Sequence, residues 1–334
     1  MGECMGKRYQ MLAARVPRQK AEAVRSLLQR RGVADNRYKI TPHGEFVDIP
    51  LEAPLKEPGV RVVRGQYPLR RPADPLERLK ELLPERPIPR HWQRIGNVIV
   101  LKLLPASDDE KALGKAYAHV LGAKTVLAYD GVRGVCREPR VRLIYGDETE
   151  TVHVENGIKY KMDVARIMWC GGNKHERMRM AHVSNPAETV VDMFAGIGYF
   201  TLPMAVYSQP QIYAFELNPV AHHYLQENIR TNHVEDRVVV ELGDCRNAPE
   251  GIADRVVMGY LDSIPFLEKG MRVLKDLGGV IHFHQVVPNE RVGDIETNIR
   301  CLARDRGFNS AINHRRVKSY APCITHWVFD IALS

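Results

Sequence analysis

The residues best suited to bind a nucleotide-like ligand follow an apolar stretch at 189–193. This stretch contains an acid, Asp192, and leads into a Gly-x-Gly turn formed by Gly196 and Gly198, after which a helical pattern begins. Glycines let the backbone approach a ligand closely, and ligands of open α/β sheets bind beyond the carboxyl ends of the strands. We therefore expect a binding site to begin at Asp192.

Two further carboxylates follow the next two predicted strands. Glu216 comes 24 positions after Asp192, where a carboxylate can accept hydrogen bonds from both ribose hydroxyls, and Asp244 could hold an adenine amino group. Three carboxylates would repel a pyrophosphate, which also prefers a third glycine where this chain has Thr201. The pattern favours S-adenosylmethionine over a nicotinamide dinucleotide. The alternative is that these are only turn residues at the ends of strands.

An alternation of strands and helices would position these groups. From residue 188 onward, amphipathic helical patterns separate apolar strand-like runs at 189–193, 211–215, 237–242, 255–258 and 279–284. This alternation predicts βαβ units and a parallel sheet covered by helices. The expected fold class is α/β, with a Rossmann-type domain.

We expect three domains, at residues 1–83, 84–170 and 171–334. The first two are predicted to be small α+β modules, and the stretch between 57 and 90, dense in Pro and Arg, is expected to contain the boundary between them. The middle module contains a basic cluster, namely Lys124, Arg133, Arg137, Arg140 and Arg142. A formal charge of +8 favours a polyanionic partner, because phosphate neutralisation drives most nucleic-acid affinity. The alternative is a solvated basic surface without a partner.

Neither a metal site nor a membrane segment is predicted. The six cysteines show no paired C-x-x-C spacing, so we expect reduced thiols rather than a zinc site or disulfides. The strand pair His282 and His284 lacks a third ligand, and the adjacent His222 and His223 would point in different directions on a helix. The apolar runs are too short to span a bilayer and no signal-peptide stretch is visible. We expect a cytoplasmic protein without a membrane partner, and a monomer.

Five stretches of the chain resemble a known family, at residues 38–50, 172–177, 192–203, 279–284 and 317–322. They are similar to two related tRNA enzymes of archaea and eukaryotes. One is the N1-methyltransferase of the guanosine 3′ of the anticodon. The other is the wybutosine-synthesis aminocarboxypropyltransferase, which acts on the tricyclic base made from that guanosine in phenylalanine tRNA. The resemblance implies a class I methyltransferase fold, S-adenosylmethionine as cofactor, and the anticodon loop of tRNA-Phe as partner, with RNA-binding roles for the two N-terminal modules.

The resemblance also implies roles for individual residues. Arg140 matches the arginine with which the methyltransferase steadies its target guanine, and Glu176 matches its proposed general base. These two are the predicted catalytic residues. The predicted cofactor-binding residues are Asp192, Phe194, Gly196, Gly198, Tyr199, Glu216, Asp244 and Gly259.

One departure separates the two enzymes of the family. After the fourth strand the methyltransferase carries an asparagine that positions the target base, whereas this chain has Gly259, which we expect to free space beside the methionyl arm. Tyr199 stands where the methyltransferase tends to have proline, and resembles the aminocarboxypropyl enzyme. The resemblance therefore implies transfer of the 3-amino-3-carboxypropyl group with release of methylthioadenosine. A tRNA methyltransferase, acting on guanine N1 or on a carbon of the wyosine precursor, and a non-catalytic tRNA-binding protein remain the alternatives.

Overall fold

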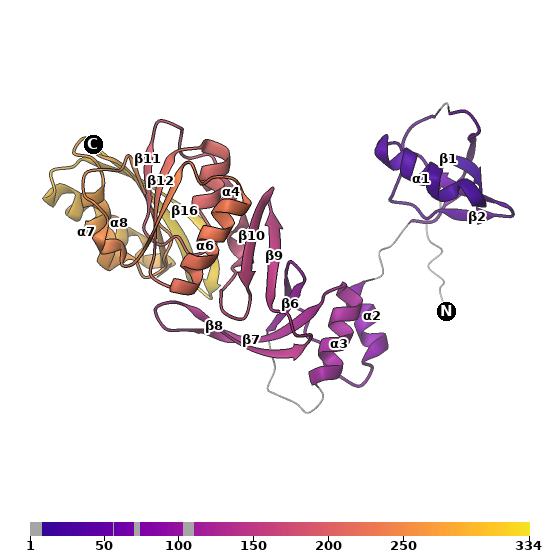
Figure 1. Cartoon of the computed structure of the whole chain (residues 1–334), viewed down its shortest axis with the longest axis horizontal. Helices are drawn as coiled ribbons and strands as arrows, with labels where there is room; N and C mark the ends of the chain where they lie inside the picture. The colour runs from indigo at the N-terminus through magenta and orange to yellow at the C-terminus, as the bar shows by residue number, and fades with distance from the viewer. Residues whose placement is uncertain (1–8, 56, 70–73, 103–109) are drawn as a thin grey trace. The chain divides into compact units, whose positions relative to one another are not determined.

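A computed structural model describes residues 9–55, 57–69, 74–102 and 110–334 and divides the chain into two compact units (Figure 1). Unit 1 comprises residues 1–81 and unit 2 comprises residues 82–334. The helix α2 (Pro75–Leu82) crosses the division point. The division of the chain into three domains stays a prediction.

Unit 1 is built on one antiparallel sheet with strand order β2-β3-β1-β4. Its elements are β1 (Tyr9–Pro17), α1 (Ala21–Arg30), β2 (Thr41–His43), β3 (Phe46–Pro50) and β4 (Arg61–Tyr67). Leu28 of α1 is buried together with Ala14, Val16 and Ile49 of the sheet. This helix-on-sheet packing gives the unit a hydrophobic core of its own.

The first part of unit 2 is a four-stranded sheet followed by a hairpin. The sheet has the order β5-β6-β7-β8, and the helix that follows β6 packs against β7 and β8. The elements are β5 (Trp92–Ile95), β6 (Val98–Lys102), α3 (Glu110–Leu121), β7 (Thr125–Arg133) and β8 (Glu138–Tyr145), then β9 (Glu150–Glu155) and β10 (Ile158–Asp163). The loop between β7 and β8 contains two residues of positive φ, Gly134 and Arg137 (+65° and +51°). We call its residues 134–137 the hairpin tip.

The rest of unit 2 is a seven-stranded sheet of order β13-β12-β11-β14-β15-β17-β16. Its strands are β11 (Thr189–Asp192), β12 (Gln211–Glu216), β13 (Val238–Leu242), β14 (Arg255–Met258), β15 (Gly279–Pro288), β16 (Ser310–Ala321) and β17 (Ile324–Leu333). Its helices are α4 (Lys174–Met180), α5 (Thr201–Pro203), α6 (Pro219–Thr231), α7 (Leu267–Val273) and α8 (Val292–Asp305). Strands β11 to β15 pair in parallel, and β17 pairs antiparallel with both of its neighbours. The predicted Rossmann-type sheet is confirmed.

The last predicted strand was too short. It was expected to end at residue 284, but β15 continues to Pro288 because β17 pairs with it along its whole length. Its polar residues His282, His284 and Gln285 are all buried, so their polarity does not mark a strand end. The hairpin β16–β17 was not predicted.

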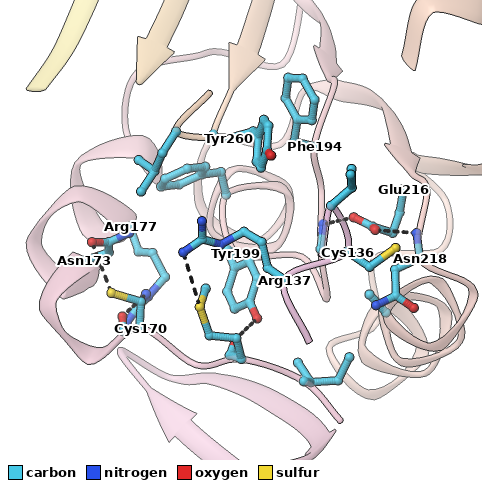
Figure 2. Close-up of a pocket in the computed structure, with 18 of the residues that line it drawn as sticks. Cys136, Arg137, Cys170, Asn173, Arg177, Phe194, Tyr199, Glu216, Asn218 and Tyr260 are labelled. Atoms are coloured by element: carbon cyan, nitrogen blue, oxygen red, sulfur yellow. Dashed lines mark hydrogen bonds between the residues drawn. The ribbon is translucent and has the colours of Figure 1, made fainter. Parts of the chain in front are cut away.

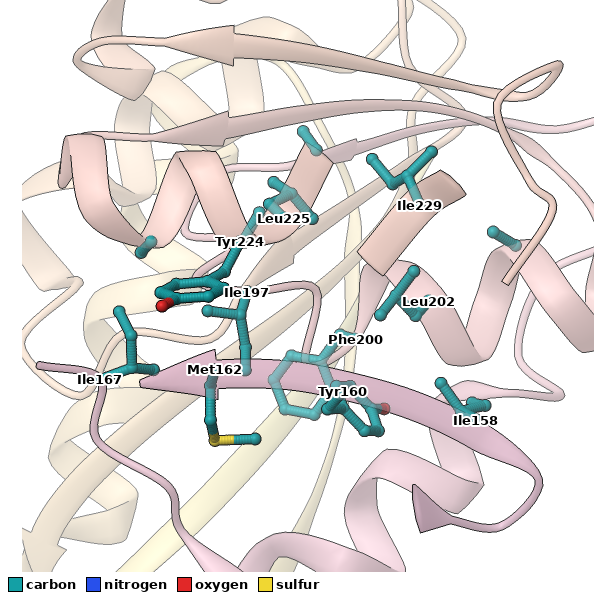
Figure 3. Close-up of a cluster of buried hydrophobic side chains, with 14 of the residues drawn as sticks. Ile158, Tyr160, Met162, Ile167, Ile197, Phe200, Leu202, Tyr224, Leu225 and Ile229 are labelled. Carbon is teal, nitrogen blue, oxygen red and sulfur yellow. The ribbon is translucent and has the colours of Figure 1, made fainter. Parts of the chain in front are cut away.

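Both faces of the seven-stranded sheet are covered. On β11, Val190 packs into one core cluster with helix α6, and Val191 packs into a second with α7 and α8. The first cluster also takes in β10, whose Ile158, Tyr160 and Met162 lie close to the helices of the large sheet (Figure 3). The β9–β10 hairpin is therefore part of the core beneath the large sheet.

The side chains of α6 fix this hairpin further. Asn228 accepts a hydrogen bond from the backbone N–H of Lys161 at 2.6 Å and donates one to its carbonyl at 3.1 Å. Asn232 makes the same pair of bonds with Lys159, at 2.9 and 2.7 Å.

The helices in the described part of the chain are all too short or too polar to span a membrane.

Candidate functional site

A pocket opens where the parallel strands end, between them and the hairpin tip (Figure 2). Five of the predicted cofactor-binding residues line it, namely Phe194, Gly196, Tyr199, Glu216 and Gly259. Other elements contribute Cys136, Arg137, Met168, Cys170, Asn173, Arg177, Phe200, Asn218, Tyr260, Lys318, Tyr320 and His326. The topology thus brings residues from 136 to 326 to one place.

The carboxylate of Glu216 is held at one end of the pocket by backbone groups. It accepts hydrogen bonds from the N–H groups of Gly196 and Asn218, each at 2.7 Å. Burial raises the pKa of this carboxyl, while the backbone donors oppose the rise. A carboxylate fixed in this way can accept hydrogen bonds from a ribose diol.

Asp192 lies beneath the glycine turn rather than in the pocket. Its side chain is fully buried and accepts hydrogen bonds from Thr201 Oγ1 at 2.7 Å and from the N–H of Phe194 at 3.2 Å. Burial raises its pKa to about 6. Asp192 therefore positions the turn, a role that its place in the sequence does not reveal.

The two glycines of the turn are required by geometry. Gly196 has φ +59°, and a Cβ there would lie 2.5 Å from the ring of Tyr199. Gly198 has φ +99°, and a Cβ would lie 2.6 Å from Leu202. A side chain at either position would be strained by both the backbone conformation and these contacts.

Tyr199 closes the base of the pocket. Its hydroxyl donates a hydrogen bond to the carbonyl of Met168, and its ring centroid lies 5.6 Å from that of Trp169. Burial raises the pKa of the phenol, which therefore stays neutral. The tyrosine ties the glycine turn to the segment that precedes α4.

An aromatic ring occupies the space on the Cβ side of Gly259, and the expectation that this glycine frees space beside the methionyl arm stays a prediction. A Cβ at this position would lie 2.8 Å from the ring of Phe200. Phe200 in turn stacks on His284, with ring centroids 5.0 Å apart and an interplanar angle of 24°. The glycine therefore makes room for this aromatic stack, while still lining the pocket.

Asp244 lies in an adjoining hollow with Phe194, Glu216 and Tyr260. Its carboxylate accepts hydrogen bonds from the backbone N–H of Arg246 at 2.9 Å and from the guanidinium of Arg246 at 2.5 to 3.1 Å. The hydrogen bond from that side chain lowers the pKa of Asp244. The rings of Phe194 and Tyr260 line the same hollow and contact each other, with centroids 5.4 Å apart.

Neither predicted catalytic residue is among those that line the pocket. Glu176 is 5% exposed and accepts hydrogen bonds from Arg179, which also pairs with Asp330. Arg140 is exposed on β8 and pairs with Asp130. The roles of both residues stay predictions.

The next residue after Glu176, Arg177, does line the pocket but has its charge compensated. Its guanidinium makes a bidentate ion pair with Glu155 at 2.7 and 2.9 Å, donates to the carbonyl of Cys170 and lies 4.5 Å over the ring of Trp169. Such a buried pair fixes the residues around it more than it attracts a ligand.

Sequence reasoning missed several pocket residues. Arg137 at the hairpin tip approaches the sulfur of Met168 at 3.7 Å, and Lys318 on β16 approaches that of Cys170 at 2.6 Å. His326 lies opposite Lys318 on β17. The signals available were Arg137 within the basic cluster and Lys318 within the stretch 317–322, but only the fold brings them beside the glycine turn.

The described residues contain no group of three or more His, Cys, Asp or Glu side chains placed to hold a metal ion. His282 and His284 instead make hydrogen bonds with Asp330 and His326.

Comparison with known proteins matches three family models along the chain. The TRM5/TYW2 methyltransferase domain matches residues 151–307, the TYW2 N-terminal domain matches 76–149, and the tRNA methyltransferase 5 N-terminal domain matches 13–58. The chain is 44% identical over 264 residues to tRNA(Phe) (4-demethylwyosine(37)-C(7)) aminocarboxypropyltransferase of Pyrococcus horikoshii, covering 76% of this chain and 94% of that protein.

Two further relatives extend the comparison. The crystal structure of P. horikoshii TYW2 in complex with MeSAdo superposes with a TM-score of 0.69 at 40% identity, covering 77% of this chain and 98% of the other. The tRNA (guanine(37)-N(1))-methyltransferase Trm5b of Pyrococcus abyssi is 34% identical over 97% of this chain and 99% of its own length. The similarity to the P. horikoshii protein is thus higher but leaves about a quarter of this chain unmatched.

Proposed function

Because the chain belongs to the TRM5/TYW2 family, we propose that it transfers the 3-amino-3-carboxypropyl group of S-adenosylmethionine to the tricyclic wybutosine precursor of tRNA-Phe. The observation that carries this assignment is the 44% identity to the P. horikoshii aminocarboxypropyltransferase, against 34% to the P. abyssi methyltransferase. The transferase and cofactor predicted from the sequence are confirmed. Methylthioadenosine is the by-product of this transfer.

The pocket suits S-adenosylmethionine at its adenosine end. Glu216 offers the ribose a carboxylate that the backbone already orients, and the turn at Gly196 and Gly198 has no space for side chains. Phe194 and Tyr260 line the hollow proposed for the adenine, with Asp244 placed for its amino group. The cofactor supplies a sulfonium whose three attached carbons are all electrophilic, so the pose set by these residues decides which carbon reacts.

At the other end of the pocket a cation is placed to hold the transferred arm. Figure 2 shows Glu216 on one side of the pocket and Cys170 and Asn173 on the other, with Tyr199 between them. Lys318 joins this second end, where its ammonium lies 2.6 Å from the Cys170 sulfur. Its charge suits the α-carboxylate of the arm, and holding that carboxylate would aim the γ-carbon at the target base.

The basic cluster is proposed to bind the tRNA backbone. Arg137 lies at the hairpin tip beside the pocket, and Arg133, Arg140 and Arg142 are on strands β7 and β8. Unit 1 is proposed as a second tRNA-binding module, since it matches the tRNA methyltransferase 5 N-terminal domain. The anticodon loop of tRNA-Phe as the binding site, action as a monomer and a cytoplasmic location stay predictions.

Labelled cofactor tests the assignment. Cofactor labelled in the carboxyl group of its methionine arm is expected to transfer label to tRNA-Phe carrying the tricyclic precursor, with one methylthioadenosine formed per transfer. Methyl-labelled cofactor is expected to leave the tRNA unlabelled. Transfer of methyl label to guanosine-bearing tRNA, without carboxyl label, would assign the chain to the methyltransferases. Stoichiometric cofactor binding without any turnover would indicate a non-catalytic tRNA-binding protein.

A further inference from the structure

Two buried histidines connect the pocket with Glu176. His326 on β17 lines the pocket, and its Nε2 lies 3.0 Å from Nδ1 of His284 on β15. On the far side of His284, its Nε2 lies 3.8 Å from Oε1 of Glu176. Glu176 itself does not line the pocket, and the two rings form a path between the pocket and its carboxylate.

The outer nitrogen of each ring is left without a hydrogen bond. In the part of the chain that the structure describes, Nδ1 of His326 and Nε2 of His284 are both buried and have no hydrogen-bond partner. Unsatisfied buried polar atoms destabilise a fold, so two of them in one histidine pair call for a functional reason. The free nitrogen of His326 belongs to the ring that lines the pocket, and that of His284 is the atom nearest Glu176.

Both rings are neutral in this environment. Burial lowers the pKa of His326 to about 3. The neighbouring His284 and Lys318 lower this pKa further, whereas Glu176 opposes the decrease. Burial also lowers the pKa of His284 to about 3. His282 and Arg179 lower this pKa as well, whereas Asp330 opposes the decrease. A neutral imidazole can take a proton at one nitrogen while it releases one from the other.

We propose that His326 accepts the proton from the ring carbon of the tricyclic base, and that His284 relays a proton from His326 to Glu176. This proposal rests on the proposed function. The ring carbon bonds to the γ-carbon of the arm, the γ-carbon–sulfur bond breaks, and its electron pair leaves on the sulfur of methylthioadenosine. The C–H bond of the ring carbon then breaks, its electron pair returns to the ring, and its proton goes to Nδ1 of His326.

The relay then moves the charge away from the two rings. The Nε2 proton of His326 passes to Nδ1 of His284, and the Nε2 proton of His284 passes to the Glu176 carboxylate. Arg179 keeps a carboxylate partner when Glu176 is protonated, because it also pairs with Asp330 at 3.1 Å. After product release the proton returns to solvent by the same path.

Phe200 and Gly259 support this arrangement. The Phe200 ring stacks on His284 and lines the pocket, so it holds the His284 ring in place. Only a glycine at 259 leaves room for that ring. The departure from the methyltransferase pattern at this position thus serves the relay.

The test compares His326→Gln, His284→Gln and Glu176→Gln with His282→Gln. His282 is the control, since it is also buried on β15 and bonds to Arg255 and to Asp330, which pairs with Arg179 but carries no proton of the relay. Single-turnover rates are measured with saturating cofactor and with precursor tRNA bearing protium or deuterium on the accepting carbon. The three relay variants are expected to react about 10²- to 10⁴-fold more slowly. They should also show a primary isotope effect larger than that of the wild type, because proton loss becomes rate-limiting, and cofactor affinity should stay within about twofold.

Two results would overturn the relay. One is turnover of His326→Gln and Glu176→Gln within about threefold of the wild type, and the other is slow turnover without an increased isotope effect, as a purely structural role would produce. The same isotope effect in His282→Gln would also count against it. If His326→Gln does not fold, the nearly isosteric Glu176→Gln decides by the same criterion. Failure of the wild type to transfer carboxyl label would instead count against the proposed function.

Discussion

The segment around the glycine turn, which we call the floor, and the strands β7 and β8 that lead to the hairpin tip, which we call the rim, hold their charged groups in opposite ways. In the floor, Asp192 and Glu216 are anchored by backbone N–H groups and a buried hydroxyl, and neither has a side-chain cation as a hydrogen-bond partner. In the rim, formed by β7 and β8, Arg140 and Arg142 pair with the side chains of Asp130 and Glu110. The floor is pre-organised for one ligand. The rim carries charges that can exchange partners, which suits a long polyanion.

The largest effect should follow from removing the carboxylate of the floor that faces the ribose. Glu216→Ala is expected to weaken S-adenosylmethionine and methylthioadenosine binding alike, by about ten- to a hundredfold, because a hydrogen bond to a charged group contributes roughly 1.5–3 kcal/mol. Asp244→Ala should cost less, since Arg246 already occupies its carboxylate. Calorimetry of both variants measures this, and tRNA affinity serves as the control. Unchanged cofactor affinity in both variants would remove the site assignment.

A smaller and more selective effect is expected at the opposite end of the pocket. Lys318→Met should weaken binding of S-adenosylmethionine by roughly tenfold, the scale of one hydrogen bond to a charged group, and leave methylthioadenosine binding unchanged because that molecule lacks the arm. Arg316→Met, also on β16 but not among the pocket residues, is the matched control. Equal weakening of both ligands by Lys318→Met would show that the lysine supports the pocket without contacting the arm.

The buried acid of the floor should reveal itself in the pH dependence of stability. The pKa of Asp192 is about 6 in the folded protein against 3.8 as its ordinary value, so the folded state binds the proton more tightly. Asp192 therefore stabilises the fold less as the pH rises through 6, and more as it falls. Relative to Asp192→Asn, the wild type should gain about 1–2 kcal/mol in free energy of unfolding between pH 7 and pH 5. Denaturant titrations measure this, and a pH-independent difference would contradict the buried, unpaired acid.

The smallest effect per residue is expected in the rim. Arg140→Ala should lower tRNA affinity a few-fold and reduce the slope of log affinity against log salt by about 0.7–0.9, the contribution of one neutralised phosphate. Cofactor affinity should not change. Filter binding at several salt concentrations gives the slope. A wild-type affinity independent of salt would mean that the basic cluster does not contact phosphates.

The sequence alone determined the sheet and the ligand class. Apolar runs separated by amphipathic patterns specify a parallel sheet because each strand must bury both faces, as Val190 and Val191 do on β11. The acids after successive strands and the two glycines then identified the cofactor, because parallel strands end at the same edge. Local pattern was sufficient for these features since each depends on residues that are neighbours in the chain.

Tertiary structure alone decided which groups meet in the pocket and which only support it. Asp192 turned out to hold the glycine turn, and Gly259 to make room for Phe200, because burial and side-chain direction depend on contacts between distant segments. Lys318 and His326 reach the pocket through the β16–β17 hairpin, which pairs with β15 beyond the end predicted for that strand. Polar residues carry no periodic signal once they are buried inside the core, so their neighbours appear only in the folded chain.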